Sequence, residues 1–241
     1  MTQHTVIVGG TAGIGLATAR ALTDGGGHRV TVVGRDPERL KSAVAAIGEE
    51  RGAQGRVASM TDRAALDELF GQLGPIDHLV VTAPGTGCPG TLAELDLDAL
   101  ERAFSTKFTG TASTVQAALP QLSKQGSVTL VSAGSAQAAL PGTAGLAAVN
   151  GAVEVLVPTL ALELAPIRVN CVSPGVVDTD WWERVGSAEQ RAEALADFTA
   201  HIPAGRPGRA EEVADVIAML VRNAYMTGVV IPVDGGLRLK P

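Results

Sequence analysis

Three glycines near the start of the chain have the spacing of a phosphate-binding loop. Gly9, Gly13 and Gly15 follow the β-branched residues 6–8 and open a stretch with apolar residues at helical spacing. Gly9 would allow a tight turn, Gly13 a close approach of the backbone to a pyrophosphate, and Gly15 close packing of helix on strand. The free N–H groups and partial positive charge at the helix start would attract phosphate. We therefore predict a dinucleotide site, with an ordinary strand–turn–helix connection as the alternative.

The elements that must position this loop alternate between strands and helices. We expect strands at residues 6–8, 29–33, 56–58, 77–82, 127–131, 168–172 and 229–233. We expect helices at residues 13–23, 37–47, 62–73, 96–119, 145–164 and 213–221, with Pro158 bending or locally breaking one of them. Such alternation predicts an α/β fold, with a doubly wound, mainly parallel sheet and helices on both faces. Its ligand crevice would lie at the carboxyl ends of the strands.

The length and charge of the chain limit its organisation and its partners. A chain of 241 residues is short for two domains, so we expect one domain over residues 1–241. Residues 178–202 fit the alternation least, and we interpret them as a lid over the site. The net charge of −6, without long runs of one sign, indicates no surface for nucleic acid or anionic lipid.

The number of cysteines, the start of the first strand and the length of the apolar runs indicate the cellular compartment. Cys88 and Cys171 are too few for a disulfide framework, so free thiols in a reducing cytosol are expected. The first strand begins almost at Met1, which leaves no room for a signal peptide. No apolar run is long enough to cross a membrane. We therefore expect a cytoplasmic protein with no membrane partner and no bound metal.

Several motifs resemble those of the short-chain dehydrogenase/reductase family. They occur in the family's order over nearly the whole chain, at residues 8–15, 162–170, 173–179, 205–208, 211–214, 225–228 and 233–236. The resemblance implies a Rossmann-type sheet of seven parallel strands in the order 3-2-1-4-5-6-7. It also implies an oxidoreductase that moves a hydride between a nicotinamide cofactor and a small-molecule substrate, assembled as a homodimer or homotetramer.

Most of the family's cofactor-binding positions carry matching residues. They are Gly9, Thr11, Ala12, Gly13, Ile14, Arg35, Ser59, Met60, Ala83, Pro84, Gly85, Pro174, Gly175, Val177 and Thr179. Arg35 stands where NADP-preferring relatives place a basic residue, since a guanidinium can pair with the 2′-phosphate, to which Thr11 could add a hydroxyl. The alternative for Arg35 is a solvated charge, and Asp36 beside it weakens the NADP assignment slightly. The resemblance therefore implies NADP(H) as the cofactor.

The family's catalytic residues are replaced at the positions to which the resemblance assigns them. The Tyr-x-x-x-Lys motif falls on Leu146 and Asn150, the serine on Ala133 and the asparagine on Lys107. The only tyrosine in the chain is Tyr225, in a carboxyl-terminal motif. In the family a tyrosine, its pKa lowered by the lysine, protonates the substrate oxygen during hydride transfer. Leu146 can donate no proton, so the resemblance implies an unorthodox catalytic centre.

Two functions remain open. In the first, the protein is an NADP(H)-dependent reductase of a small organic carbonyl, iminium or enone compound, with Lys107, Ser132, Ser135 and Asn150 as candidate catalytic residues. Lys107 could stabilise developing charge or donate a proton, or it could extend to the surface. The serines and Asn150 could donate hydrogen bonds, or be turn and helix-packing residues. In the second, the protein binds NADP(H) without redox activity, as a regulator or an enzyme for a non-redox step such as isomerisation, although the retained Thr179 argues against this.

Four further features leave alternatives open. The apolar helix at residues 145–164 would be central core or a subunit interface, and we favour an interface because the family pairs subunits through its fourth and fifth helices. Trp181 and Trp182 would pack on substrate or cofactor, or within the lid. His201 would be a surface residue, although it could reach the crevice. Cys88 could line the site, but nothing nearby suggests an activated thiol.

Overall fold

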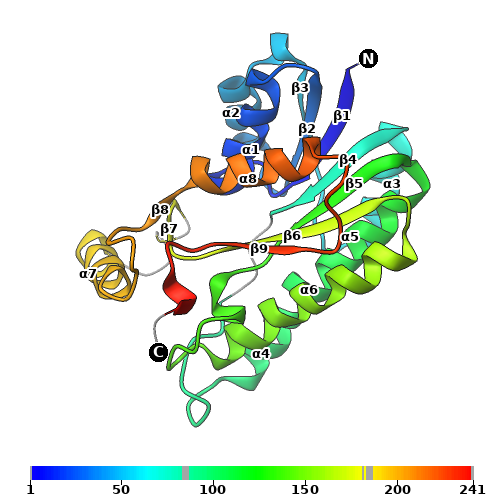
Figure 1. Cartoon of the computed structure of the whole chain (residues 1–241). Helices are drawn as coiled ribbons and strands as arrows, with labels where there is room; N and C mark the ends of the chain where they lie inside the picture. Colours follow the sequence, from blue (N-terminus) through cyan, green and yellow to red (C-terminus); the bar gives the residue numbers. More distant parts are fainter. Residues whose placement is uncertain (1, 83–86, 181, 183–186, 240–241) are drawn as a thin grey trace.

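A computed structural model describes residues 2–82, 87–180, 182 and 187–239 of the chain (Figure 1). The predictions for Ala83, Pro84, Gly85 and Trp181 lie outside these residues. The described residues form a twisted sheet with helices packed on both of its faces (Figure 1). Helix α7 (Ala188–Thr199), within the predicted lid at residues 178–202, stands apart from them (Figure 1).

The sheet has seven strands, all paired in parallel, in the order β3-β2-β1-β4-β5-β6-β9. The strands are β1 (Gln3–Val8), β2 (His28–Gly34), β3 (Ala53–Val57), β4 (Ile76–Val81), β5 (Leu122–Val131), β6 (Arg168–Pro174) and β9 (Val230–Val233). The two-residue strands β7 (Val177–Asp178) and β8 (Gly208–Arg209) pair separately. Because β9 is the seventh strand of the large sheet, the predicted order and the doubly wound α/β fold are confirmed.

Helices cover the sheet in two groups. They are α1 (Gly13–Asp24), α2 (Pro37–Ile47), α3 (Arg63–Leu73), α4 (Leu97–Ala103), α5 (Gly110–Ala118), α6 (Ala144–Glu163), α7 (Ala188–Thr199) and α8 (Ala210–Arg222). Helices α1, α2 and α8 bury residues such as Leu22, Leu40 and Ile217 against one face. Helices α3, α5 and α6 pack on the other face (Figure 1). Alternate residues of each strand thus enter two separate cores, as a parallel sheet buried on both sides requires.

Two predicted elements differ from the observed ones. Strand β3 begins at Ala53, earlier than predicted, because its polar residues at an edge of the sheet give no apolar signal. The single helix predicted at residues 96–119 is divided into α4, a π-helical segment Phe104–Thr109, and α5. Such segments insert an extra residue into a helix and often occur at functional sites. Here the segment contains Lys107.

Helix α6 corrects two predictions. It continues through Pro158 without a break, and because Pro158 is exposed, water can reach the backbone carbonyl that lacks a helical donor. By its length and composition it is also apolar enough to cross a bilayer, contrary to the expectation that no run of the chain is. Its inner face nevertheless packs on the sheet through residues such as Val153 and Val157. A core helix passes the same criterion, so α6 alone does not indicate a membrane span.

Buried histidines occupy the amino-terminal ends of the strands, far from the predicted crevice. His28 Nδ1 lies 3.1 Å from Thr5 Oγ1, and His78 Nδ1 lies 2.8 Å from Ser127 Oγ. Among the described residues, His78 Nε2 is buried without a hydrogen-bond partner. Burial lowers the pKa of His4, His28 and His78, and that of His78 falls to about 4, assisted by the nearby charges of His28 and Arg168. These histidines are therefore neutral at pH 7.

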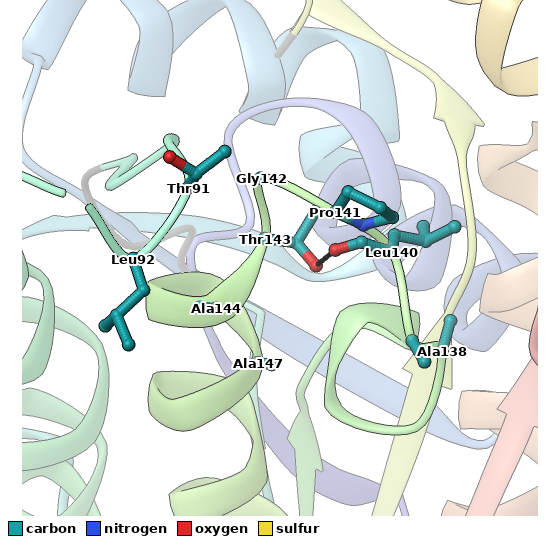
Figure 2. A pocket seen from close by; sticks show the side chains of 10 residues that line it. Thr91, Leu92, Ala138, Leu140, Pro141, Gly142, Thr143, Ala144 and Ala147 are labelled. Atoms are coloured by element: carbon teal, nitrogen blue, oxygen red, sulfur yellow. Dashed lines mark hydrogen bonds between the residues drawn. The ribbon is translucent and has the colours of Figure 1, made fainter. Parts of the chain in front are cut away.

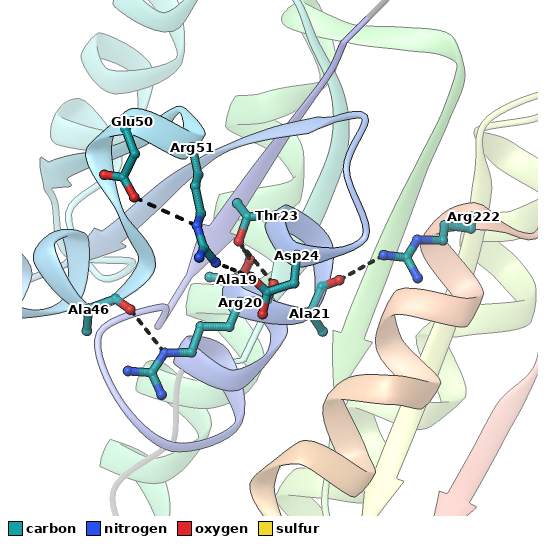
Figure 3. Close-up of polar contacts among 9 residues, drawn as sticks. All are labelled: Ala19, Arg20, Ala21, Thr23, Asp24, Ala46, Glu50, Arg51 and Arg222. Carbon is teal, nitrogen blue, oxygen red and sulfur yellow. Dashed lines mark hydrogen bonds and ion pairs between the residues drawn. The ribbon is translucent and has the colours of Figure 1, made fainter.

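Two arginines close the same end of the molecule. The guanidinium of Arg168 is buried and donates to the backbone carbonyls of Leu220 at 2.8 Å and Val221 at 2.9 Å, near the end of α8. Arg222 donates to the carbonyl of Ala21 in α1 at 2.8 Å (Figure 3). Both arginines therefore supply hydrogen bonds to carbonyls that the ends of helices leave unpaired.

Candidate active site

A cleft with a volume of about 1290 Å³ lies at the carboxyl ends of β1, β2, β4, β5 and β6, as predicted for this type of sheet. It is lined by every predicted site residue that the structure describes. These are Gly9, Thr11, Ala12, Gly13, Ile14, Arg35, Ser59, Met60, Lys107, Ser132, Ser135, Asn150, Pro174, Gly175, Val177 and Thr179. The fold therefore brings the two predicted sets of residues, one for the cofactor and one for catalysis, to a single cavity.

A smaller hollow of about 510 Å³ adjoins this cleft and shares Leu140 and Thr143 with it. Figure 2 shows Thr91 and Leu92 on one side of the hollow and the segment before α6 on the other. The hydroxyl of Thr143 donates to the carbonyl of Leu140 at 2.7 Å and tightens this turn. The lining of the hollow is mainly apolar. The hollow therefore adds to the cleft a surface that suits an apolar part of a ligand.

The glycine loop has the geometry of a phosphate cradle. Gly9 and Gly13 have φ angles of +88° and +50°, which side chains rarely allow. A β-carbon at Gly15 would overlap the carbonyl of Gly9 and lie 2.6 Å from the hydroxyl of Thr82. The same hydroxyl donates to the carbonyls of Val8 at 3.2 Å and Gly9 at 3.1 Å, which fixes the loop to β4. No side chain caps the start of α1, so its N–H groups are available to an anion.

Arginines stand at the end of the cleft beyond β2. Arg35 is exposed, and Arg39, which the sequence analysis missed, lines the cleft beside it. Asp36 also lines this end, but its carboxylate caps α2 by accepting from the backbone N–H groups of Glu38 at 2.9 Å and Arg39 at 3.1 Å. The position of Arg39, one helical turn after Arg35, was the available signal. This end of the cleft therefore presents positive charge to an anion.

Ser59 and Thr179 lie at other points along the cleft. The Ser59 hydroxyl is 2.9 Å from that of Thr61, so its contacts are local. Met60 packs against Gly110 of α5, where a β-carbon would lie only 3.0 Å from the methionine Cε. Thr179 faces the glycine loop, since a β-carbon at Gly13 would lie 3.4 Å from its side chain. The segment after β6 thus closes over the start of α1.

Lys107 is buried in the wall of the cleft. Its side chain is 7 % exposed, which excludes the alternative that it extends to the surface. Burial lowers the pKa of Lys107 to about 8, and the nearby thiol of Cys171 opposes this change. The ammonium and the neutral amine are therefore both accessible near pH 8, which suits a group that donates a proton.

Leu146 and Asn150 occupy one side of α6 within the cleft. Leu146 also packs with Cys88 and Val149 in an apolar cluster. The amide nitrogen of Asn150 donates to the carbonyl of Leu146 at 2.9 Å and to the Ser135 hydroxyl at 3.4 Å. Both hydrogens of that amide are thus directed to the protein, in accord with the helix-packing alternative for Asn150. Cys88 is buried and burial raises its pKa, so it is not an activated thiol.

Glu154, which the sequence analysis did not select, organises the polar groups beneath the cleft. Its Oε1 accepts from the hydroxyls of Ser132 at 2.6 Å and Ser173 at 2.8 Å, and its Oε2 accepts from the amide of Gln137 at 2.9 Å. It is the only charged residue between Lys124 and Glu163, and this was a signal in the sequence. Half-buried carboxylates in apolar helices are retained where they have hydrogen-bonding partners.

Two residues of the predicted lid have defined places. Trp182 is buried, and its indole N–H donates to the carbonyl of Val177 at 2.9 Å. Its ring packs on Phe198 of α7, with the ring centroids 5.7 Å apart, and both side chains line the cleft. His201 is exposed, lies 2.8 Å from the carbonyl of Asp197, and is outside the cleft lining, which confirms it as a surface residue.

The described residues contain no cluster of three or more histidines, cysteines and carboxylates that could hold a metal ion. Apart from Asp36 and Asp180, the polar side chains that line the cleft are hydroxyls, an amide and cations, which suit an organic, phosphorylated ligand. The arrangement can bind a dinucleotide along the carboxyl ends of β1 and β2. It can also place polar side chains that could exchange protons, such as Lys107 and Ser132, near the carboxyl end of β5.

Comparisons with known proteins agree with this geometry. The family model described as enoyl-(acyl carrier protein) reductase matches residues 9–238. The chain is 32 % identical to a 2,3-dihydro-2,3-dihydroxybenzoate dehydrogenase of Bacillus subtilis, over 97 % of this chain and 95 % of that one. It resembles the crystal structure of a small-chain dehydrogenase in complex with NADPH, with a TM-score of 0.81, 31 % identity, and coverage of 99 % and 100 % of the two chains. It also resembles an actinorhodin polyketide ketoreductase variant with NADPH, with a TM-score of 0.87, 28 % identity, and coverage of 98 % and 97 %.

Proposed function

Because the chain belongs to the short-chain dehydrogenase/reductase family, we propose that it is an NADP(H)-dependent oxidoreductase with an unorthodox catalytic centre. The pyrophosphate would lie on the free N–H groups of α1, and the 2′-phosphate between Arg35 and Arg39. The segment that ends at Thr179 would hold the nicotinamide carboxamide. The NADPH complexes of two similar structures support this cofactor. When bound, the reduced nicotinamide supplies a hydride.

Lys107 is the observation that carries the redox assignment. Negative charge develops on a carbonyl oxygen when its carbon accepts a hydride, and an ammonium in the wall of the cleft stabilises that charge. Leu146 at the family's tyrosine position cannot do so. The substrate is a small organic carbonyl, iminium or enone compound, and its apolar part would contact Leu146 and the hollow beside the cleft.

A second candidate function is NADP(H) binding without redox chemistry, in a regulator or an isomerase. The observation in its favour is the loss of free donors on α6, where Leu146 is apolar and both amide hydrogens of Asn150 are directed to the protein. Hydride transfer from NADPH to a carbonyl compound distinguishes the two functions, since the second allows cofactor binding but no oxidation of the cofactor.

The assembly and the lid are further parts of the proposal. Val155 and Leu162 on the outer side of α6 are 74 % and 83 % exposed, so this face would be covered in a homodimer or homotetramer. Residues 178–202 would close over the substrate as the lid of a single cytoplasmic domain that binds neither nucleic acid nor membrane. Trp182 and Phe198 would connect lid movement to the cleft.

Comparative binding of NADPH and NADH tests the cofactor assignment. We expect wild-type protein to bind NADPH more tightly than NADH in a nicotinamide fluorescence titration. Replacing both Arg35 and Arg39 with alanine should weaken NADPH binding by roughly 10- to 100-fold for each arginine removed, because each charged hydrogen bond contributes about 1.5–3 kcal/mol, and should leave NADH binding unchanged. Arg63→Ala, an exposed arginine on α3, is the matched control. Binding of neither cofactor would overturn the proposal.

A further inference from the structure

The carboxylate of Glu154 connects the interior of the cleft wall with the protein surface. Its Oε1 is held by Ser132, which lines the cleft, at 2.6 Å and by Ser173 at 2.8 Å. Its Oε2 is held at 2.9 Å by Gln137, whose side chain is exposed. A proton on this carboxyl group can therefore be exchanged with water on one side and with Ser132 on the other.

Ser132 is placed to pass a proton onward. It directly follows Val131, the last residue of β5, and it lines the cleft together with Lys107 and Asn150. Its hydroxyl hydrogen is directed to Glu154, so its lone pairs are left to accept a hydrogen from a group in the cleft. The short distance to a carboxylate is typical of a strong, charge-assisted hydrogen bond.

We propose that Ser132 and Glu154 form a proton relay that replaces the tyrosine and lysine of the family, an inference that rests on the proposed oxidoreductase function. In reduction, the protonated Glu154 carboxyl group donates its hydrogen to Ser132 in a hydrogen bond, so that the hydroxyl hydrogen of Ser132 turns from Glu154 to the substrate. The carbonyl carbon then gains a hydride and the carbonyl oxygen gains the hydroxyl proton of Ser132. Ser132 then takes the proton of the Glu154 carboxyl group, and Glu154 regains one from water at Oε2. In oxidation the alcohol proton follows the reverse path to the Glu154 carboxylate. Ser132 is the catalytic residue, and Glu154 is a positioning residue that acts through it.

The charged and titratable groups around the relay suit this role. The thiol of Cys171 in β6 lies close to Ser132 and donates to the carbonyl of Val172 at 3.4 Å. Burial raises the pKa of Cys171 to about 11, so the thiol stays neutral and does not compete for the proton. Lys107 faces the same region from the π-helical segment, and its charge interacts with that of Cys171. The cation would stabilise the substrate oxygen while the relay delivers the proton. Glu154 supplies the only negative charge that α6 presents to Cys171.

Two hydride acceptors separate proton delivery from all other effects of a substitution. Benzaldehyde needs a hydride and a proton, whereas the N-methyl-3,4-dihydroisoquinolinium cation needs only a hydride to become a neutral amine. We expect Glu154→Gln and Ser132→Ala to slow benzaldehyde reduction by on the order of 10²-fold, as loss of an acid does, and to change iminium reduction less than about twofold. NADPH affinity, measured by fluorescence without turnover, should stay unchanged in both variants.

Ser173→Ala is the matched control, because Ser173 donates a similar hydrogen bond to the same Oε1 but does not line the cleft. It should retain benzaldehyde reduction within about threefold. If Glu154→Gln does not fold, Glu154→Asp and Ser132→Ala take its place.

Each other outcome overturns the relay in a recognisable way. Equal losses with both acceptors, or an equal loss in Ser173→Ala, would make Glu154 a structural strut between β5, β6 and α6. Wild-type protein that binds NADPH and reduces only the iminium would show that no proton is delivered. Absence of NADPH binding, or binding without reduction of either acceptor, would instead overturn the proposed function, and the relay with it.

Discussion

The two ends of the seven-stranded sheet hold buried polar side chains in different ways. At the carboxyl ends of the strands, Lys107 and Ser132 line a cleft of about 1290 Å³. At the amino-terminal ends, His78 and Arg168 are directed to neighbouring strands and to helix carbonyls. Burial and a lowered pKa occur at both ends. A lowered pKa by itself therefore does not separate a candidate site residue from a structural one in this protein, whereas a place in the lining of the cavity does.

Removal of the Lys107 ammonium should cause the largest loss of catalytic rate. It tests whether the buried polar groups at the carboxyl ends of the strands take part in the reaction. Lys107→Met keeps the length of the side chain but not its charge. We expect the rate of benzaldehyde reduction to fall by on the order of 10²-fold, because the developing oxyanion loses its cation. The stability to urea should not fall, since burial of an ammonium is costly. Lys124→Met, an exposed lysine, is the control. Unchanged turnover in Lys107→Met would remove it from the mechanism.

Acidification should lower the free energy of unfolding through the buried histidines at the amino-terminal ends of the strands. The folded-state pKa of His78 is about 4 against 6.5 for an unperturbed histidine, so below pH 6.5 the unfolded chain binds more protons than the folded one. The free energy of unfolding is therefore complete above pH 6.5 and falls as the pH decreases toward 4. From His78 alone we expect a loss of about 2 kcal/mol at pH 5. His4 and His28 shift in the same direction and should increase this loss.

Urea unfolding at pH 7.5 and pH 5 measures this effect. His78→Gln should reduce the difference between the two pH values, because glutamine cannot be protonated there. His201→Gln provides the control, since His201 is exposed at the carboxyl-terminal end of α7 and its substitution should leave the difference unchanged. If wild type and His78→Gln lose the same stability on acidification, then the buried His78 at the amino-terminal ends of the strands is not the source of the acid sensitivity.

Two glycines within helices differ in the same way, because one lies beside the cleft and the other lies away from it, and their substitution should have smaller effects. Gly15→Ala places a β-carbon against the carbonyl of Gly9 and the Thr82 hydroxyl, and we expect a loss of about 1–3 kcal/mol in stability with weaker NADPH binding. Gly71 of α3 has open space around its β-carbon position. Gly71→Ala should therefore raise stability by up to about 1 kcal/mol. Thermal unfolding and fluorescence titration measure both, and a tolerated Gly15→Ala would contradict the packing role of the loop.

The fold could be predicted from short-range patterns, whereas part of the site could not. Runs such as residues 30–33 are β-branched and buried within the sheet, so each strand is visible by itself. The glycine loop is visible for the same reason, because its spacing is local. Strand β3 was placed late, since Gln54 and Arg56 on an edge strand interrupt any apolar signal.

Glu154 shows why the remaining part of the candidate site could not be predicted from the sequence. Its partners Ser132 and Ser173 belong to two different strands, and nothing local in the sequence connects a carboxylate on α6 with either of them. The π-helical segment that turns Lys107 into the protein is likewise invisible to helical periodicity, because the apolar spacing on both sides of it stays regular. Long-range hydrogen bonds and small irregularities of a helix thus decide the chemistry, although neither leaves a local pattern.

The cap that Asp36 provides for α2 separates folding from coenzyme choice. Because the carboxylate is occupied by the N–H groups of Glu38 and Arg39, the adjacent position 35 carries no structural duty and faces solvent. Selection can therefore exchange Arg35 for an acidic or neutral residue in a single step without loosening the helix. Under the proposed function, preference between the two nicotinamide coenzymes would be adjustable at a position that the cap of α2 does not use.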